Sequence, residues 1–336
     1  MSIQATIEII EQVFSHPNAD SLELVKVLGF QCVVPKNMYK NNDMIIFIQP
    51  DSVLPKKDHS WAAEFLKYAP TRVKAIKLRG EWSEGLIIPV NTLYNIDIKI
   101  GLEVSDILGI THYESTNSII EKEGIIGQLA YNIPKTDEER FENLRKTLIT
   151  YYGQKVDVTL KIDGQSWSVF YILNKENPDN DEFGITGRKV RYDINLKNNY
   201  TNHIVRYDIH NKLRDYCRKY NVSICLRGES YGKGIQKMKN NPHSDKEPGL
   251  AIFSVFLIDQ RQYANKGEKH YFVDLCKELN LPMVDMIEEN VELTPELLTK
   301  YSSELKKLNN QPFEGVVIKG SNFTFKVINK HYDSLK

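Results

Sequence analysis

The chain has 336 residues, with 41% hydrophobic and 26% charged side chains, which is ordinary for a globular protein and favours two domains. Its 44 basic and 44 acidic side chains cancel, so a site for a polyanion has to be a local patch. The four scattered cysteines lack Cys-x-x-Cys spacing, which argues against a zinc site or disulfide framework and fits a reducing, intracellular compartment. We see no membrane-spanning apolar run and no targeting signal, so we expect no membrane partner.

Short β-type runs separated by turn residues fill the N-terminal third. They include 23–28, 31–34, 44–48 and 85–89, with one short helix expected near 61–68. About five strands in roughly a hundred residues predict a small closed barrel, for which the oligonucleotide-binding (OB) fold is the leading candidate. We place the end of this domain at residue 112 and assign 113–336 to a second domain.

A basic strand is expected at 72–79, where apolar and basic residues alternate. Its outward-facing basic side chains are candidates to follow an RNA phosphate backbone: Arg72, Lys74, Lys77 and Arg79. A solvated strand face without a ligand is the alternative. His16, in the segment His-Pro-Asn-Ala-Asp, is expected to fix a turn rather than bind a ligand.

The segment 156–164 carries the candidate nucleophile. Alternation places Asp157, Thr159 and Lys161 on one face of a strand. A lysine there can act as a nucleophile because desolvation and neighbouring cations favour the neutral amine. Asp163 repeats the parity of Lys161, and Gly164 allows a ligand to approach the backbone closely. Taken alone, the pattern fits an exposed strand-end lysine followed by an Asp-Gly turn better than it fits a catalytic site.

The remaining elements flank further polar residues. A helix is expected to start at an N-cap, Thr136, with Glu139 completing a capping box, and a long helix is expected over 200–220. A strand at 222–226 leads into Gly228-Glu229, and an apolar strand covers 250–258. Strands 313–319 and 323–328 are expected to form a hairpin around Gly-Ser-Asn, with Thr324, Lys326 and Ile328 on one face.

Together these segments resemble the ordered motifs of covalent nucleotidyltransferases, a superfamily of ATP-dependent DNA ligases, RNA ligases and mRNA capping enzymes. The motifs are Lys161-Ile-Asp-Gly, Arg188, Gly228-Glu, the aromatic strand with Phe256, Glu314-Gly-Val-Val-Ile-Lys and Lys326. The run from Gly228 to Gln236 is similar to the RNA ligase 2 family. The OB-type module ahead of the catalytic part resembles Deinococcus- and Naegleria-type RNA ligases, and no C-terminal OB domain of DNA ligases or capping enzymes is seen.

The resemblance implies an α+β chain: an OB-fold barrel, then an ATP-grasp-like adenylation domain of antiparallel sheets flanked by helices. It implies an ATP-dependent RNA ligase that joins 3′-OH and 5′-phosphate RNA ends, at nicks in duplexes, through a lysyl-AMP. The ATP site would contain Lys161, Asp163 and Gly164, with Lys319 and Lys326 on phosphate, Arg188 near ribose or phosphate, Glu229 on the ribose hydroxyls and Phe256 stacked on adenine. Glu314, with Asp163 as second candidate, would bind Mg²⁺ or Mn²⁺.

Three departures from the family pattern bear on substrate preference rather than on the reaction. Leu257 replaces an acidic residue, Ile328 replaces a lysine, and Gly-Arg-Lys stands where relatives have Ser-Arg-Asn. The roles of Lys135, Arg140 and Lys330 stay open. Two alternatives remain: a DNA ligase of unusual domain order, and a non-catalytic tRNA- or RNA-binding OB protein. We expect a monomer, because no long heptad or apolar tail is present.

Overall fold

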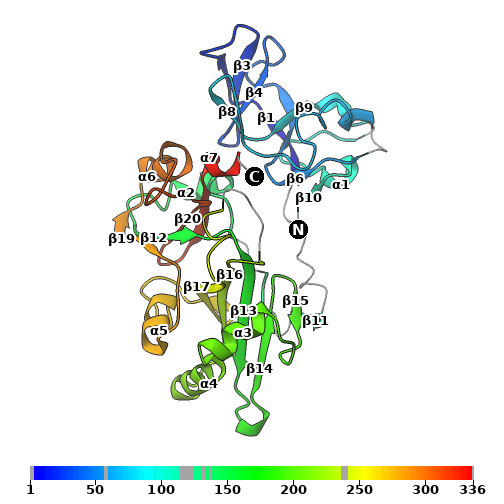
Figure 1. The fold of residues 1–336 in the computed structure, drawn as a ribbon. Coiled ribbons are helices and arrows are strands. Elements are labelled where there is room, and N and C mark those ends of the chain that lie inside the picture. Colours follow the sequence, from blue (N-terminus) through cyan, green and yellow to red (C-terminus); the bar gives the residue numbers. More distant parts are fainter. Residues whose placement is uncertain are drawn as a thin grey trace. The chain divides into compact units, whose positions relative to one another are not determined.

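The computed structural model describes residues 4–56, 60–94, 96–113, 124–129, 133–135, 138–235 and 241–334. The chain divides into two compact units (Figure 1). The first comprises Met1–Ser115, Phe141–Ile149 and Asp333–Lys336, and the second comprises Thr116–Arg140 and Thr150–Tyr332. Compactness does not test where independently folding domains end, so the division near residue 112 stays a prediction.

Short antiparallel strands build the first unit. One sheet has the order β1 (Ala5–Ile9), β5 (Met44–Ile48), β9 (Leu86–Pro89), and a second has the order β2 (Gln12–Ser15), β3 (Leu22–Val27), β4 (Phe30–Pro35). Two pairs accompany them: β7 (Ile76–Leu78) with β8 (Glu81–Ser83), and β6 (Ser52–Val53) with β10 (Thr111–His112). The helical pieces are η1 (Ser60–Ala62), η2 (Val90–Thr92), α1 (Ser105–Leu108), η4 (Phe141–Leu144) and α2 (Arg145–Leu148). The helix expected near 61–68 is therefore only a short 3₁₀ segment followed by turns.

The turn role predicted for His16 is confirmed. Its ring is buried, with Nδ1 accepting from the backbone N–H of Asn18 at 3.1 Å and Nε2 lying 3.1 Å from the carbonyl oxygen of Leu78. Both nitrogens are thus used by the fold, which leaves the imidazole no role as a ligand.

The expected basic strand at 72–79 is wrong in its first half. Only Ile76–Leu78 is a strand, and the Arg72 side chain is buried instead of pointing outward. Its guanidinium forms ion pairs with Asp51 and, at 3.2 Å, with Asp333. A cation removed from water needs such partners. Arg72 therefore stabilises the first unit, and we no longer assign it to RNA.

The second unit contains two antiparallel sheets. Within the described ranges, the seven-stranded sheet has the order β11 (Ile125–Gln128), β15 (Val190–Tyr192), β14 (Glu182–Thr186), β13 (Gln165–Ile172), β16 (Ile224–Tyr231), β17 (Gly249–Leu257), β18 (Gln262–Tyr263). The four-stranded sheet has the order β19 (Met286–Glu292), β12 (Lys155–Lys161), β20 (Gly315–Lys319), β21 (Thr324–Ile328). The predicted hairpin is confirmed, with Lys319 opposite Thr324.

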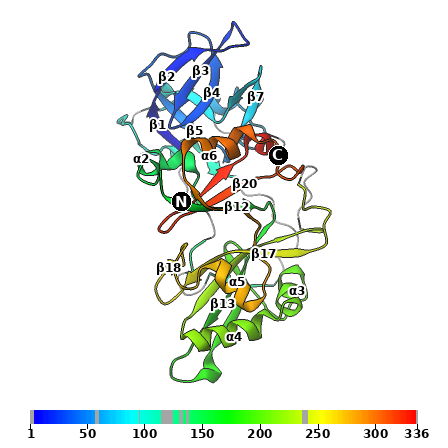
Figure 2. The same cartoon turned by 90° about the vertical axis from the view of Figure 1, so that its left-hand side faces the viewer.

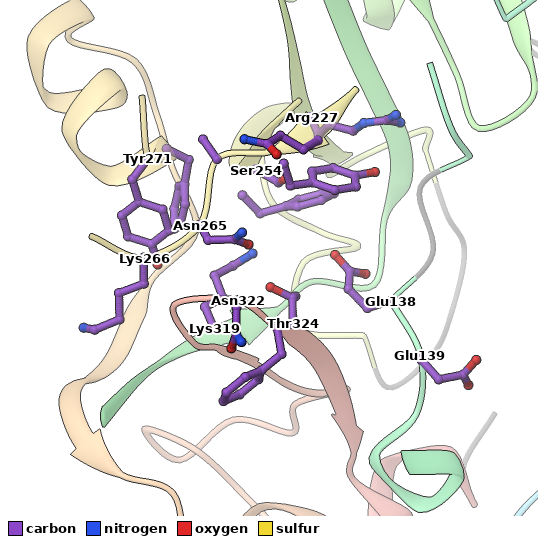
Figure 3. A pocket seen from close by; sticks show the side chains of 16 residues that line it. Glu138, Glu139, Arg227, Ser254, Asn265, Lys266, Tyr271, Lys319, Asn322 and Thr324 are labelled. Carbon is purple, nitrogen blue, oxygen red and sulfur yellow. The ribbon is translucent and has the colours of Figure 1, made fainter. Parts of the chain in front are cut away.

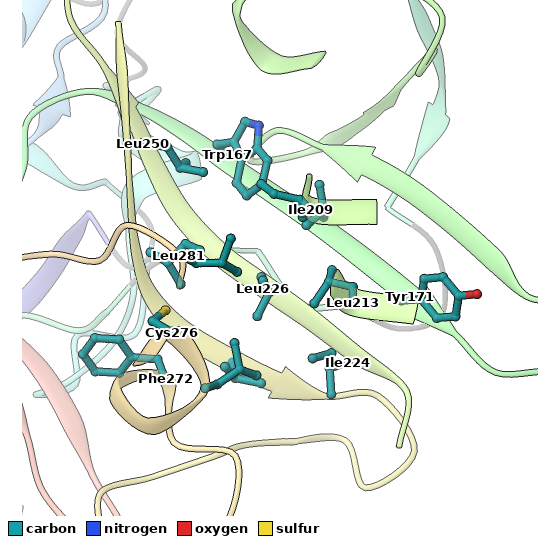
Figure 4. Close-up of a cluster of buried hydrophobic side chains, with 14 of the residues drawn as sticks. Trp167, Tyr171, Ile209, Leu213, Ile224, Leu226, Leu250, Phe272, Cys276 and Leu281 are labelled. Carbon is teal, nitrogen blue, oxygen red and sulfur yellow. The ribbon is translucent and has the colours of Figure 1, made fainter. Parts of the chain in front are cut away.

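Helices cover one face of the seven-stranded sheet. The helical segments are η5 (Pro178–Asn180), α3 (Asn199–Arg206), α4 (Ile209–Tyr220), α5 (Phe272–Leu279), α6 (Pro295–Thr299), η6 (Lys300–Glu304) and α7 (Lys330–Asp333), whose last residue belongs to the first unit. Helices α4 and α5 lie over the sheet (Figure 2), where Trp167, Leu213, Leu226 and Phe272 form a fully buried core (Figure 4). Because side chains alternate along a strand, Ser166 of β13 and Glu229 of β16 face the other side.

Two helix predictions are wrong. The helix expected over 200–220 is two helices, because Asp208 adopts a left-handed conformation with φ 50° between α3 and α4. The helix expected after Thr136 does not begin there: residues 138–140 are not helical and η4 starts at Phe141. Thr136 itself lies outside the described residues, so its capping role stays a prediction.

The four cysteines occur as separate, buried free thiols, as their spacing predicted. Among the described residues, no helix combines the length and apolar character needed to cross a bilayer.

Candidate active site

Lys161 ends β12 in the centre of the four-stranded sheet. It pairs with Gly315 of β20, while Thr159 pairs with Val317, and Val317 in turn pairs with Lys326 of β21. Residues directly opposite each other in antiparallel strands project from the same face. Lys161 and Lys326 therefore share one face of the sheet, as the alternation in both segments predicted.

Lys161 forms an ion pair with Glu314. Its Nζ lies 2.7 Å from Glu314 Oε2, and the two side chains are 24% and 10% exposed. Burial lowers the pKa of Lys161, but the carboxylates of Glu314, Glu229 and Asp163 outweigh it and raise the pKa above its ordinary value. The charged groups that act most strongly on Lys161 are thus the anions expected in this site, not cations that would favour the neutral amine, and the resting lysine is an ammonium.

Glu229 reaches the same site from the other sheet. It lies within β16, opposite Ser166 of β13, on the face away from the helices, and its Oε1 accepts from the N–H of Gly164 at 3.2 Å. Burial, followed by the charges of Glu314 and Asp163, raises the pKa of Glu229 to about 8 against the pull of Lys161. A Cβ on Gly164 would lie 2.5 Å from the carbonyl oxygen of Ser230, so this turn accepts only glycine.

Asp163 is held from two sides. The Tyr332 hydroxyl donates to its Oδ2 at 3.0 Å, and Asn241 Nδ2 donates to its carbonyl oxygen at 2.6 Å. Asp163, Lys161, Glu314 and Tyr332 line one cavity of about 70 Å³. Tyr332 and Asn241 were missed from the sequence, because one lies in the tail and the other in a loop, where no periodicity marks a functional residue.

The carboxylates beside Lys161 suit a hydrated divalent cation. Glu314 and Asp163 supply oxygen donors around one small cavity. In the part of the chain that the structure describes, no cluster of three or more His, Cys, Asp or Glu residues is arranged to hold a metal by itself. Mg²⁺ is commonly bound by one or two carboxylates, its remaining ligands being water and substrate phosphates, so this donor set fits such an ion.

A larger cavity of about 410 Å³ lies on the same face, towards the other end of β20. Side chains from both sheets line it, including Ser254 from one and Lys319 and Thr324 from the other (Figure 3). Lys319 is buried, burial lowers its pKa, and its Nζ lies 5.2 Å from the ring centroid of Phe272. Lys319 lies opposite Asp157, four residues along β12 from Lys161, and its predicted contact with phosphate stays a prediction.

Phe253, rather than Phe256, lines this cavity. Phe256 is 3% exposed and packs against Phe170 and Cys225 in a separate apolar cluster, so neither ring face is open to adenine. The β16–β17 register shifts so that Gly228 pairs with Ile252 but Arg227 pairs with Ser254, which leaves Phe253 as the extra residue of a β-bulge. The family resemblance, which named Phe256, carried no information about this bulge.

The other predicted residues are placed as follows. Arg188 lies half-buried in the turn between β14 and β15. In the first unit, Lys77 is exposed and its Nζ lies 5.1 Å from the Trp82 ring centroid, while Arg79 is exposed and Lys74 is half-buried. Their predicted nucleic-acid roles stay predictions, as does the motif contribution of Gln236, which lies outside the described residues.

Comparisons with known proteins identify relatives of both parts. An RNA ligase family model matches residues 154–329, and an OB-fold domain model matches residues 4–90. Naegleria gruberi RNA ligase with pyrophosphate has a TM-score of 0.83 and 27% identity over 99% of this chain and 98% of that chain. A lysine-to-methionine variant of that enzyme with AMP and manganese has a TM-score of 0.82 and 26% identity, covering 98% and 97%. A lysine-to-alanine variant with ATP and manganese has a TM-score of 0.81 and 27% identity, covering 98% of each.

A search of curated protein sequences gives no significant match. The structural relatives and the OB-fold match confirm the predicted architecture, an N-terminal OB-fold domain followed by antiparallel sheets with helices.

Proposed function

The chain belongs to the RNA ligase family, and we propose that it is an ATP-dependent ligase that joins 3′-OH and 5′-phosphate RNA ends through a covalent adenylate on Lys161. One observation carries the proposal: acidic groups from both sheets meet at Lys161. Glu314, next to β20 of the same sheet, pairs with Lys161, and Glu229 of the other sheet accepts a hydrogen bond from Gly164 in the turn after Lys161. Structures of the Naegleria gruberi enzyme with AMP, ATP, pyrophosphate and manganese support nucleotide and metal use by this chain.

The proposed reaction has three transfers at phosphorus. Lys161 Nζ loses a proton and attacks the α-phosphorus of ATP, so that a P–N bond forms as the bond to pyrophosphate breaks. An RNA 5′-phosphate oxygen then attacks the same phosphorus and releases the lysine. Finally a 3′-hydroxyl attacks the activated 5′-phosphate and AMP leaves. Lys326, on the same sheet face as Lys161, is our candidate to stabilise negative charge in these steps.

The carboxylates around Lys161 would hold the lysine unreactive in the free enzyme. An ammonium paired with Glu314 at 2.7 Å has no lone pair for attack. A divalent cation bound by Glu314 and Asp163 would supply positive charge that competes with the ammonium and favours the free amine. We infer that metal and ATP must both be bound before Lys161 reacts.

We assign the larger cavity to the nucleoside part of ATP. It lies on the face that carries Lys161, and Phe253 in its wall offers the ring that a base needs for stacking. Glu229 follows the cavity-lining Arg227 by two residues on β16 and interacts with the charge of Lys161, so it is our candidate for the ribose hydroxyls. For RNA, the exposed Lys77 and Arg79 and the half-buried Lys74 remain candidates in the OB-fold unit.

Covalent labelling tests the proposal. The protein is incubated with α-³²P-ATP and MnCl₂, and labelled protein is resolved under denaturing conditions. We expect a label that is stable to alkali and labile to acid, and absent from Lys161→Ala. A label that persists in Lys161→Ala, or no label on the wild type, contradicts the proposal and favours a non-catalytic RNA-binding protein.

Substrates then separate RNA from DNA joining. Duplexes with one nick, carrying RNA or DNA at the 3′-OH side, are compared with single strands. We expect sealing of the RNA-ended nick and accumulation of little adenylylated intermediate; preference for an all-DNA nick favours a DNA ligase. Gel filtration with light scattering tests the predicted monomer.

A further inference from the structure

A tyrosine in the segment after β21 lies beside the candidate active site. Tyr332, in α7 (red in Figure 1), is 2% exposed, and its hydroxyl donates to Asp163 Oδ2 at 3.0 Å. The same side chain lines the small cavity with Lys161 and Glu314.

The tail that carries Tyr332 is fixed by Asn329. This residue is fully buried; its backbone N–H donates to the carbonyl oxygen of Glu314 at 2.9 Å, and its Nδ2 donates to the carbonyl oxygen of Leu305 at 2.7 Å. Its Oδ1 accepts from the N–H groups of His331 at 2.9 Å and of Tyr332 at 3.3 Å. Asn329 thus ties the backbone at Glu314 to the turn that presents Tyr332.

Asp163 needs such a partner because it stands in a turn. It follows Lys161 by two residues, beyond the end of β12, where the ladder no longer restrains the chain. Its backbone is restrained by Asn241, but only a side-chain contact fixes the direction of the carboxylate. A strong hydrogen bond to one oxygen orients the other, and preorganised groups of this kind lower the reorganisation needed at the reacting phosphorus.

We propose that Tyr332 is a positioning residue for adenylyl transfer, which acts by orienting the Asp163 carboxylate beside Lys161. The inference rests on the proposed function, since formation of the Lys161 adenylate is its readout. Tyr332 touches neither nucleotide nor nucleophile in this scheme, so its effect passes entirely through Asp163.

The test compares two Tyr→Phe variants. Tyr332→Phe removes the hydroxyl that binds Asp163. Tyr301→Phe is a matched control, because Tyr301 is 1% exposed and its hydroxyl also donates to a carboxylate, that of Glu288, which has no part in the proposed chemistry. Single-turnover formation of labelled lysyl-AMP is measured at saturating ATP and Mn²⁺, at a temperature well below the melting point of every variant.

We expect Tyr332→Phe to lower the rate constant about tenfold, equivalent to about 1.4 kcal/mol in the barrier. Tyr301→Phe should leave it within about twofold of wild type. In an Asp163→Asn background, adding Tyr332→Phe should change the residual rate by less than about twofold, because the two residues act as one unit.

Three results would overturn the inference: a Tyr332→Phe rate within twofold of wild type, equal losses in both Tyr→Phe variants, or full additivity with Asp163→Asn. If Asp163→Asn forms no adenylate at all, the comparison of the two Tyr→Phe variants decides alone. A wild type that never becomes labelled is a different outcome, because it refutes the proposed function itself.

Discussion

Replacing Glu229 by glutamine should stabilise the protein at high pH and slow adenylylation. The pKa of Glu229 rises from an ordinary 4.5 to about 8, chiefly because burial disfavours its charge. Between these values the folded protein binds more protons than the unfolded chain, so this group's contribution to the free energy of unfolding falls as pH rises. Glutamine has no charge to bury and keeps an oxygen that can accept from Gly164.

The magnitude follows from the size of the pKa change. At about 1.4 kcal/mol per pKa unit, the full change sets a ceiling of about 5 kcal/mol above pH 8. Glu229 keeps some solvent contact and faces the ammonium of Lys161, so we expect a gain of about 1–3 kcal/mol at pH 9. Near pH 5, where the carboxyl is mostly protonated in the folded protein, the gain should be close to zero.

Urea unfolding at pH 5, 7 and 9 measures this difference, since titrating groups that do not interact with Glu229 cancel between variant and wild type. Glu288→Gln is the opposite control. Burial by itself would raise the pKa of Glu288, but hydrogen bonds from Lys300 and Tyr301 outweigh it and lower the pKa. Removing this carboxylate should therefore destabilise the protein at pH 7 and 9. A Glu229→Gln difference that does not change from pH 5 to 9 refutes the reasoning. Lysyl-AMP formation by this variant should fall at every pH if Glu229 holds the ribose.

Three shorter predictions concern the remaining residues. Gly164→Ala should slow lysyl-AMP formation by at least about tenfold, because the added Cβ would lie 2.5 Å from a backbone oxygen. Gly127→Ala is the control, because open space surrounds its added carbon and the rate should not change. Equal rates in the two variants would contradict the predicted contact. Phe253→Ala should weaken ATP binding by about 1–3 kcal/mol in calorimetry. Phe256→Ala should instead lower the free energy of unfolding by about 3–5 kcal/mol without changing ATP affinity. The reverse pattern would restore Phe256 as the residue that stacks on adenine. Lys77→Ala should reduce the salt dependence of RNA binding by about one unit of log–log slope, and an unchanged slope would remove it from the interface.

Local patterns in the sequence were sufficient for several structural features. The alternation in 156–161 placed Asp157, Thr159 and Lys161 on one face, and the same rule placed Lys326 on the matching face of β21. The Gly-Ser-Asn signal after Lys319 correctly indicated a hairpin. These predictions hold because a strand's period and a tight turn are set by neighbouring residues.

The tertiary structure decided which of these residues work together. Glu314, 153 residues away and expected as a metal ligand, pairs with Lys161 and keeps it charged. A one-residue bulge placed Phe253 in the cavity wall, whereas Phe256 packs in a separate apolar cluster. Arg72 was expected at the surface but is buried, because Asp51 and Asp333 form ion pairs with its guanidinium.

The resemblance to the nucleotidyltransferase motifs made Lys161 the candidate nucleophile, and its strand parity and the glycine three residues later were local properties of the sequence. Its protonation and the orientation of Asp163 were not. A pKa depends on charges within a few ångströms in space, and the groups that act here, Glu314, Glu229 and Tyr332, arrive through long-range pairing and a returning tail.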